Sequence, residues 1–410
     1  MSAPVHVVFA VPYALETSLR FARAAAALPD VRLAVVTQED PARLPDDLRR
    51  GLAGVVRVDD ALDPDQLEGG VRRAAGALGG RVDRLIGVLE PLQVPMAQVR
   101  ERLGIRGMDA TEAHQFRDKA RMKDVLRAAG LPCARHRLAE SAEEALRFAR
   151  DCGFPLVVKP PAGAGARGTF RLEREEDLQS YLTSVPPSAK EPVLIEEFVQ
   201  GREHSFDTVS LGGRHLLHSI SVYTPTPLEV LRTPWIQWKV VLPRRIDGPE
   251  YSDIHQAGAR ALDALGMVTG FSHMEWFRRP DGTLAISEVG ARPPGAQFTS
   301  LLSWAHDLDF YAAWTRLMVH ERFDVPRRCY AAGAVYLRGQ GQGVVVHVRG
   351  AQELARELGE LLVELRLPRL GQAPSNTYEG DGFVIVRHPQ TEAVEQALER
   401  ALASVRIELG

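Results

Sequence analysis

A lysine and a glycine-rich loop stand side by side near residue 160 of the 410-residue chain. An apolar run from Pro155 to Val158 leads directly into Lys159. The loop that follows supplies three glycines and one cation: Gly163, Gly165, Gly168 and Arg167. Glycines let backbone N–H groups converge on an anion, and lysine and arginine supply the charge that phosphate oxygens require. This segment therefore predicts a loop that covers phosphate groups, and ATP is the compound we expect beneath it.

The same glycines also match the G-x-G-x-x-G pattern of dinucleotide-binding turns. That pattern requires a strand before the loop and a helix immediately after it. Here the residues from Thr169 to Leu172 alternate like a strand, and a helical pattern starts only at Glu173. A flexible hairpin is therefore favoured over a Rossmann turn, and a purely structural glycine turn is the other alternative.

Acidic residues follow on two further predicted strands. A buried strand from Val193 to Val199 carries Glu196 and Glu197, and Glu203 then alternates with polar residues along the next strand. Strict alternation places these polar side chains on one strand face. The face is either solvated or directed into a site, and the pattern alone fits both.

A second acidic pair lies in a predicted β-hairpin, where a turn at Pro280 to Thr283 joins the strands that carry Glu275 and Glu288. A loop of two or four residues makes these carboxylates direct neighbours, an arrangement that is destabilising unless a cation lies between them. Hard oxygen ligands at this separation suit Mg²⁺ bound to phosphates. A three-residue loop instead places the two carboxylates on opposite faces, so the metal hypothesis depends on register.

Three further cationic residues accompany the acids. Arg292, just beyond the hairpin, would neutralise a transferring phosphoryl group or hold a substrate carboxylate. Lys119 and Lys123 share one face of a predicted helix that begins near Thr111. For the two lysines, the pattern alone also fits the solvated face of an ordinary helix.

The predicted elements that position these residues form an α/β chain with an α+β central part. Short apolar strands alternate with helices over residues 1–95, which predicts a parallel sheet. We assign no cofactor to that domain. A stretch rich in aromatic residues and proline, 219–243, predicts a loop-dominated insertion, which either shapes a substrate pocket or supplies Trp residues that serve as packing anchors. The tail is expected to contain helices at 352–365 and 392–405. The predicted units are an N-terminal domain (1–95), linker helices (96–131), a lid (132–198), a central catalytic domain (199–325) and a C-terminal lobe (326–410).

Composition narrows the function class. A net charge of −3 argues against a dedicated nucleic-acid partner. The three widely spaced cysteines, Cys133, Cys152 and Cys329, form no disulfide framework or zinc pattern, so a reducing, cytoplasmic setting is expected. No signal peptide or membrane span is predicted. The oligomeric state is left open, with a homodimer among the options.

The ordered set of these motifs, from Lys119 to Arg292, resembles the ATP-grasp superfamily, and the resemblance covers about residues 100–295. It implies an ATP-grasp fold in which a mobile lid and an antiparallel sheet clamp ATP, with a small C-terminal lobe. It also implies roles for individual residues. Lys119 and Lys159 would bind the nucleotide phosphates. Glu196 and the backbone near Val199 would contact adenine, and Glu203 would bind the ribose. Glu275 and Glu288 would hold Mg²⁺ (or Mn²⁺), and Arg292 would bind an acyl phosphate.

The chain departs from the family at one position. Family members usually carry an asparagine two residues after the second acidic ligand, and this chain has Gly290 there. Either a water molecule replaces the amide, or a second metal ion is held more weakly.

The function implied by the resemblance is that of a carboxylate–amine ligase similar to the L-amino-acid (dipeptide) ligases. Small-molecule carboxylates and amines are then the expected substrates. A biotin-carboxylase-like enzyme that activates bicarbonate, and an ATP-binding regulator without turnover, are the alternatives.

Overall fold

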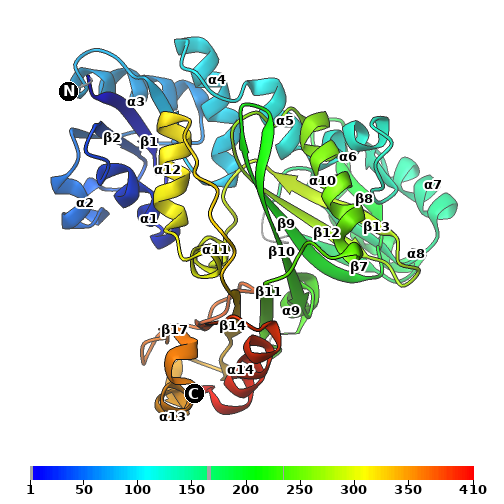
Figure 1. Cartoon of the computed structure of the whole chain (residues 1–410). Helices are drawn as coiled ribbons and strands as arrows, with labels where there is room; N and C mark the ends of the chain where they lie inside the picture. The colour runs from blue at the N-terminus through cyan, green and yellow to red at the C-terminus, as the bar shows by residue number, and fades with distance from the viewer. Residues whose placement is uncertain (1–2, 164–167, 234) are drawn as a thin grey trace.

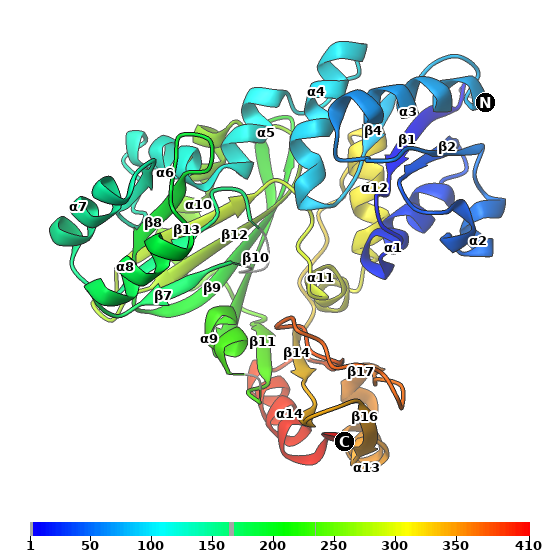
Figure 2. The same cartoon turned by 180° about the vertical axis from the view of Figure 1, so that it is seen from behind.

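A computed structural model describes residues 3–163, 168–233 and 235–410. Figures 1 and 2 show three bodies around a central gap: an N-terminal domain, a lid on the opposite side, and a C-terminal lobe below. A long central sheet extends from the lid side to the C-terminal lobe. The expected mixture of a parallel sheet, antiparallel sheets and covering helices is confirmed. Within the described ranges, no helix has the length and apolarity needed to cross a membrane.

The N-terminal domain is built on a parallel four-stranded sheet with the order β3-β2-β1-β4. The inner strand β1 (Val5–Ala10) is almost wholly apolar and buried, as expected where helices cover both faces of a parallel sheet. The strands are β1 (Val5–Ala10), β2 (Val31–Thr37), β3 (Gly54–Arg57) and β4 (Arg84–Ile86). The helices are α1 (Glu16–Ala26), α2 (Asp46–Arg50), α3 (Pro64–Ala77) and α4 (Gln93–Leu103).

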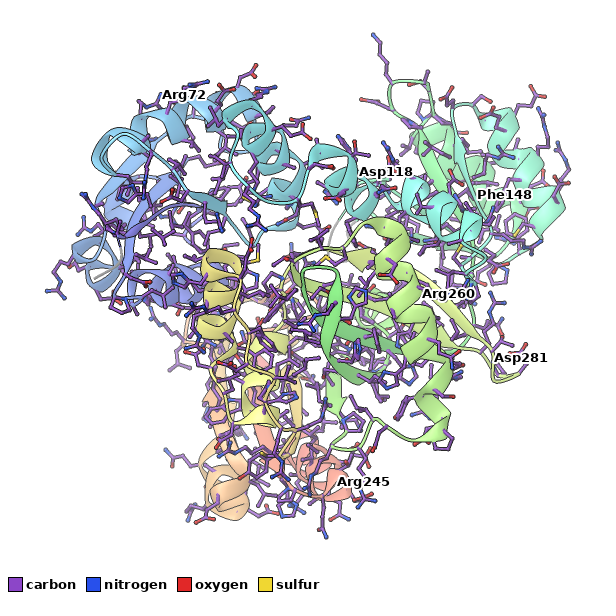
Figure 3. The ribbon with its side chains drawn as sticks, turned by 45° about the horizontal axis from the view of Figure 1, so that its top comes forward. Arg72, Asp118, Phe148, Arg245, Arg260 and Asp281 are labelled. Carbon is purple, nitrogen blue, oxygen red and sulfur yellow. The ribbon has the colours of Figure 1, made fainter. Side chains whose placement is uncertain are left out.

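Two short helices connect this domain to the lid, where the sequence predicted a single helix from Thr111. Helix α5 (Ala110–Arg117) begins at the capping residue Asp109, and α6 (Lys119–Ala128) begins at Asp118. The Asp118 side chain accepts hydrogen bonds from the first backbone N–H groups of α6, so this aspartate starts a new helix and breaks the predicted one. Figure 3 shows Asp118 where the chain crosses between the two bodies.

The lid is an antiparallel sheet with the order β5-β8-β6-β7, covered on one face by two helices. Alternation along β6 (Leu156–Lys159) directs Leu156 and Val158 toward those helices and Lys159 toward the other face. Figure 3 labels Phe148 on one covering helix. The remaining elements are β5 (His136–Ala139), α7 (Ala142–Cys152), β7 (Phe170–Leu172), α8 (Glu175–Ser184) and β8 (Val193–Glu197).

The central sheet has eight antiparallel strands in the order β13-β12-β9-β10-β11-β14-β18-β17. Its last three strands come from the tail, so hydrogen bonds run without interruption from the central part into the C-terminal lobe. The predicted domain boundary at 325/326 therefore falls between two strands, β13 and β14, that belong to the same continuous sheet. The strands are β9 (Arg202–Leu211), β10 (Arg214–Thr224), β11 (Trp238–Leu242), β12 (Gly270–Arg278), β13 (Leu284–Gly290), β14 (Ala331–Leu337), β17 (Leu362–Arg366) and β18 (Gly382–His388).

Helices and a small sheet complete the second half of the chain. The helices are α9 (Pro227–Arg232), α10 (Ser252–Leu265), α11 (Phe298–His306), α12 (Phe310–His320), α13 (Ala351–Leu358) and α14 (Thr391–Ser404). The small sheet has the order β15-β19-β16, formed by β15 (Gln340–Gly341), β16 (Val345–Arg349) and β19 (Arg406–Leu409).

Two expectations for this half are wrong in detail. The stretch 219–243 is mostly regular structure, because its aromatic residues belong to the strands β10 and β11 around the short helix α9. The helix expected at 352–365 ends at Leu358, since Gly359 adopts a positive φ of 52°. The apolar residues that follow form β17 and complete the central sheet.

The packing of α10 on the central sheet yields a stability prediction. A methyl group added at Gly258 of α10 would lie 2.5 Å from the buried ring of Phe206. Gly258→Ala should therefore lower the free energy of unfolding by about 1–3 kcal/mol, as measured by urea denaturation. Gly76→Ala in α3, where nothing lies within 4 Å, is the matched control and should raise that free energy by roughly 0.5–1 kcal/mol. Equal changes in both variants would contradict the packing argument.

Candidate active site

A cavity of about 820 Å³ lies where the lid, the central sheet, the N-terminal domain and the C-terminal lobe meet. It brings together most of the residues predicted from the sequence: Lys119, Lys159, Gly163, Glu196, Glu197, Val199, Glu203, Glu275, Glu288 and Arg292. Gly168 lies outside the lining and has a φ of 69° beside Pro160. Gly165 and Arg167 lie outside the described residues.

The β12–β13 hairpin pairs Glu275 directly with Glu288. Its loop has three residues, Pro280 to Gly282, closed by the Arg279 N–H, which donates to the Thr283 carbonyl at 2.8 Å. That loop alone would put the two carboxylates on opposite faces. A β-bulge at Ser287 adds one residue to β13 and restores the direct pairing. Figure 3 shows Asp281 at the projecting tip of this hairpin.

A third carboxylate shares this face of the sheet. Ser205 lies opposite Glu275 on the neighbouring strand β9, and Glu203 stands two residues away on the same face. Burial and the negative charge of Glu275 together raise the pKa of Glu203 well above its usual value. Crowded acids of this kind favour a cation between them.

The arrangement fits a hard divalent cation such as Mg²⁺. Glu275 and Glu288 present facing oxygen donors, and Mg²⁺ commonly binds one or two carboxylates together with water and substrate phosphates. Among the described residues, no group of three or more His, Cys, Asp or Glu side chains is placed to hold a metal ion. Water molecules or phosphate oxygens would supply the other ligands of a cation held by Glu275 and Glu288.

Lysine side chains balance these acids. The Lys119 ammonium lies 2.6 Å from the Glu288 carboxylate and 3.0 Å from the Gly163 carbonyl oxygen. Burial alone would raise the pKa of Glu288, but the charges of Lys119 and Lys159 lower it to about 2. Glu288 is therefore ionised and available as a ligand at neutral pH.

Lys123, which the sequence pattern placed on the same helix face as Lys119 without giving it a role, is buried behind the cavity lining. Its fully buried ammonium donates to the Ser287 carbonyl at 2.6 Å and lies 3.0 Å from Glu196. Lys123 thus contacts the bulge that sets the register of Glu288. Its spacing of four residues from Lys119 was the available signal, but helix periodicity does not distinguish a buried face from a solvated one.

Glu196 joins Lys123 to the lid. Its second oxygen lies 2.9 Å from the Lys159 ammonium, so this buried carboxylate bridges two lysines. Burial raises the pKa of Glu196, but the two lysine charges outweigh it and the net pKa is lowered. The contact with adenine implied by the resemblance stays a prediction, as does that of the backbone near Val199, which lines the cavity. The neighbouring Glu197 pairs with Arg135 and Arg279, each at 2.8 Å.

Arg292 faces a carboxylate from the N-terminal domain. Its guanidinium forms an ion pair with Glu90 and donates to the Pro293 carbonyl at 2.9 Å. Burial lowers the pKa of Arg292, but the charge of Glu90 outweighs it and the net pKa is raised. A Cβ at Gly290 would lie 3.3 Å from the Glu90 carboxylate, so the glycine gives this acid room. Glu90, 202 residues from Arg292, carried no signal in the sequence.

The bridging role of Glu196 predicts a large stability effect. Glu196→Gln leaves two buried lysines without their carboxylate and should lower the free energy of unfolding by about 3–5 kcal/mol at pH 7. Glu197→Gln, in the more exposed neighbouring pair, is the control and should cost about 1 kcal/mol or less. Urea denaturation of both variants measures the difference.

The same effect should depend on pH. The folded pKa of Glu196 is lowered, so its contribution is fully present above the unfolded value of about 4.3 and is lost as the pH falls through the folded pKa. The difference in free energy of unfolding between the wild-type chain and Glu196→Gln should therefore become smaller below about pH 4.3. A gap that stays constant down to pH 3 would show that the charge of Glu196 is not its cause.

Comparisons with known proteins find a matching domain family, relatives in sequence and a solved structure of the same fold. The ATP-grasp domain family matches residues 124–301. An L-arginine-specific L-amino acid ligase of Bacillus subtilis is 25% identical over 246 residues, which cover 59% of this chain and 59% of that protein. An uncharacterized protein of Sinorhizobium fredii is 25% identical over 324 residues, 77% of this chain and 66% of that protein. The chain thus aligns with less than two thirds of the length of these curated relatives.

The fold has a solved counterpart over the whole chain. The crystal structure of an L-amino acid ligase from Bacillus licheniformis superposes with a TM-score of 0.79 at 19% sequence identity, covering 100% of both chains. The family match therefore identifies an ATP-grasp domain over residues 124–301, and the solved structure shows that the whole chain shares the fold of an L-amino acid ligase.

Proposed function

We propose that the chain is an ATP-dependent ligase that activates a carboxylate as an acyl phosphate and couples it to an amine, with an amino acid among its substrates. The observation that carries the proposal is the direct pairing of Glu275 with Glu288 in a cavity that also receives Lys119, Lys159 and Arg292. The similarity to a ligase of L-amino acids supports the choice of substrate class.

The phosphate end of ATP would bind between the lid and the central sheet. Lys119 from α6 and Lys159 from β6 would neutralise its oxygens from two sides. Glu275 and Glu288 would hold Mg²⁺ or Mn²⁺, and the metal supplies further neutralisation of the phosphate charge when bound. In the structure, each of these lysines pairs with an acid: Lys119 with Glu288 and Lys159 with Glu196. Bound phosphates would compete for the two ammonium groups.

The reaction then needs positioning more than acid–base chemistry. A carboxylate oxygen of the substrate attacks the γ-phosphorus, and the bond to the bridging oxygen breaks to release ADP. The amine nitrogen next attacks the acyl carbon, the carbon–oxygen bond breaks, and phosphate leaves while the nitrogen loses a proton. Arg292 would hold the substrate carboxylate and the phosphoryl oxygens, exchanging its contact with Glu90 for them.

A direct assay separates this proposal from its alternatives. The chain is incubated with Mg²⁺–ATP and a pool of amino acids, and phosphate release and product mass are measured. Phosphate release together with an amide product supports the ligase. ADP release that requires bicarbonate and no amine would instead indicate a biotin-carboxylase-like enzyme. Tight ATP binding without phosphate release for any acid would contradict catalysis and indicate an ATP-binding regulator.

The paired carboxylates predict a specific loss of activity. Glu288→Gln removes one of the two charges that face each other and should lower the rate of phosphate release by roughly 10²–10³-fold, the usual cost of losing one preorganised electrostatic contact. Glu353→Gln, an exposed carboxylate on α13 far from the cavity lining, is the control and should keep the wild-type rate. A rate for Glu288→Gln within threefold of wild type would exclude the pair from the reaction.

A further inference from the structure

One face of the central sheet changes its chemistry from strand to strand. Glu288 and Glu275 occupy this face on β13 and β12, and Ser205 continues it on β9. On β10, Ser221 lies opposite Ser205, so Tyr223, two residues further, lies on the same face. Acidic side chains thus give way to aromatic ones across the sheet.

The aromatic half continues through the next two strands. Val240 of β11 pairs with Tyr223, which places Trp238 on the same face, and Trp238 pairs with Tyr336 of β14. The rings of Trp238 and Tyr336 are stacked at 4.7 Å. Strand alternation therefore builds a floor of rings beside the carboxylates.

Two rings from other parts of the chain complete this half of the cavity. Phe298 is the first residue of α11, and its ring lies 5.7 Å from that of Tyr223. Tyr378 comes from the loop between β17 and β18 in the C-terminal lobe, and its ring meets that of Trp238 edge-on at 4.9 Å. Trp238 and Tyr223 are likewise edge to face, at 5.4 Å. Tyr223, Trp238, Phe298 and Tyr378 all line the cavity that contains Glu275 and Arg292, and we call these four residues the aromatic wall.

Two residues of the aromatic wall, Tyr223 and Tyr378, carry hydroxyl groups. Burial raises the pKa of Tyr223 well above its usual value, and the nearby charge of Glu275 raises it further. Burial also raises the pKa of Tyr378, which responds to the charges of Glu275 and Arg292. Both side chains are therefore uncharged phenols with charged neighbours on one side and apolar rings on the other. Pro227 and Leu228 of α9 extend the apolar surface.

We propose that the aromatic wall is the subsite for the side chain of the carboxylate substrate, and that this side chain is large and apolar, of the size of leucine to phenylalanine. The inference rests on the proposed function. The carboxylate that accepts the phosphoryl group must lie near Arg292 and the Glu275–Glu288 pair, so its side chain extends toward the adjacent rings. Aromatic rings that line a cavity are typical of sites for apolar ligands. Glu229 and Arg232 of α9 also line this cavity.

Within the aromatic wall, Tyr378 is the residue that sets specificity. Trp238 is 1% exposed and stacked on Tyr336, so its replacement would disturb the sheet. Tyr378 is only partly buried and comes from a loop at the margin of the core, so shortening its side chain disturbs the sheet less than a change at Trp238 would. Its loss would widen the subsite on the side of the C-terminal lobe.

The test varies only the carboxylate. Hydroxylamine serves as the amine, and kcat/KM is measured with Mg²⁺–ATP for phenylalanine, leucine, alanine, glutamate and arginine. The kcat/KM for phenylalanine and for leucine should exceed the kcat/KM for the other three amino acids by at least about tenfold, since apolar contacts of this size change kcat/KM by roughly 10–200-fold. A preference for alanine, glutamate or arginine would overturn the proposal.

Variants then assign the preference to Tyr378. Tyr378→Ala should lower the phenylalanine-to-alanine ratio of kcat/KM by about tenfold. Tyr378→Phe, which keeps the ring, should retain that ratio. Tyr13→Ala, an exposed tyrosine of the N-terminal domain outside the cavity lining, should leave it unchanged. An equal loss for all acids in Tyr378→Ala would show that the ring does not discriminate.

A binding experiment keeps this inference separate from the proposed function. Isothermal titration with phenylalanine and with alanine is carried out on the full chain saturated with Mg²⁺ and a non-hydrolysable ATP analogue. Tighter binding of phenylalanine that is lost in Tyr378→Ala supports the subsite even if no acid is turned over. Equal binding of the two amino acids would overturn it even if the chain proves to be a ligase.

Discussion

A single extra residue in one strand governs the geometry of the site. The bulge at Ser287 shifts β13 by one position and brings the Glu288 carboxylate onto the face that carries Glu275. Because side chains alternate along a strand, the regular register would direct Glu288 to the opposite face. The buried ammonium of Lys123 donates to the carbonyl of the bulged residue. A charged hydrogen bond in the interior thus stabilises the local irregularity on which the acid pair depends.

The same lysine extends this constraint into the lid. Lys123 lies beside Glu196, and Glu196 lies beside Lys159, so one line of buried charges links the hairpin, α6 and the lid sheet. Buried ion pairs add little net stability compared with apolar packing, but each is costly to break from one side. Their effect is to fix the positions of the cationic groups relative to the acids. The site therefore has its charges in place before any ligand arrives.

Much of the fold follows from patterns that act over short distances. Alternation and turn residues predicted β6, β8 and the β12–β13 hairpin, whereas the ATP-grasp architecture was implied by the resemblance of the ordered motifs to that family. The bulge could not be predicted, because one inserted residue changes no propensity and only the partner strand reveals it. The break at Asp118 was missed because the apolar spacing continues through both helices. Glu90 was missed because its contact with Arg292 joins two separate domains.

The continuous sheet also bears on how such a chain can be divided. Strands β14, β18 and β17 come from the tail, yet they pair in series with β11 of the central part. Cutting the chain before β14 would turn β11 into an open edge with unpaired backbone groups, and such edges recruit foreign strands and promote aggregation. Trp238 would also lose the ring of Tyr336 beneath it. The C-terminal lobe is therefore not an independent unit that can be exchanged between relatives. A chimaera would have to preserve the pairing register between β11 and β14.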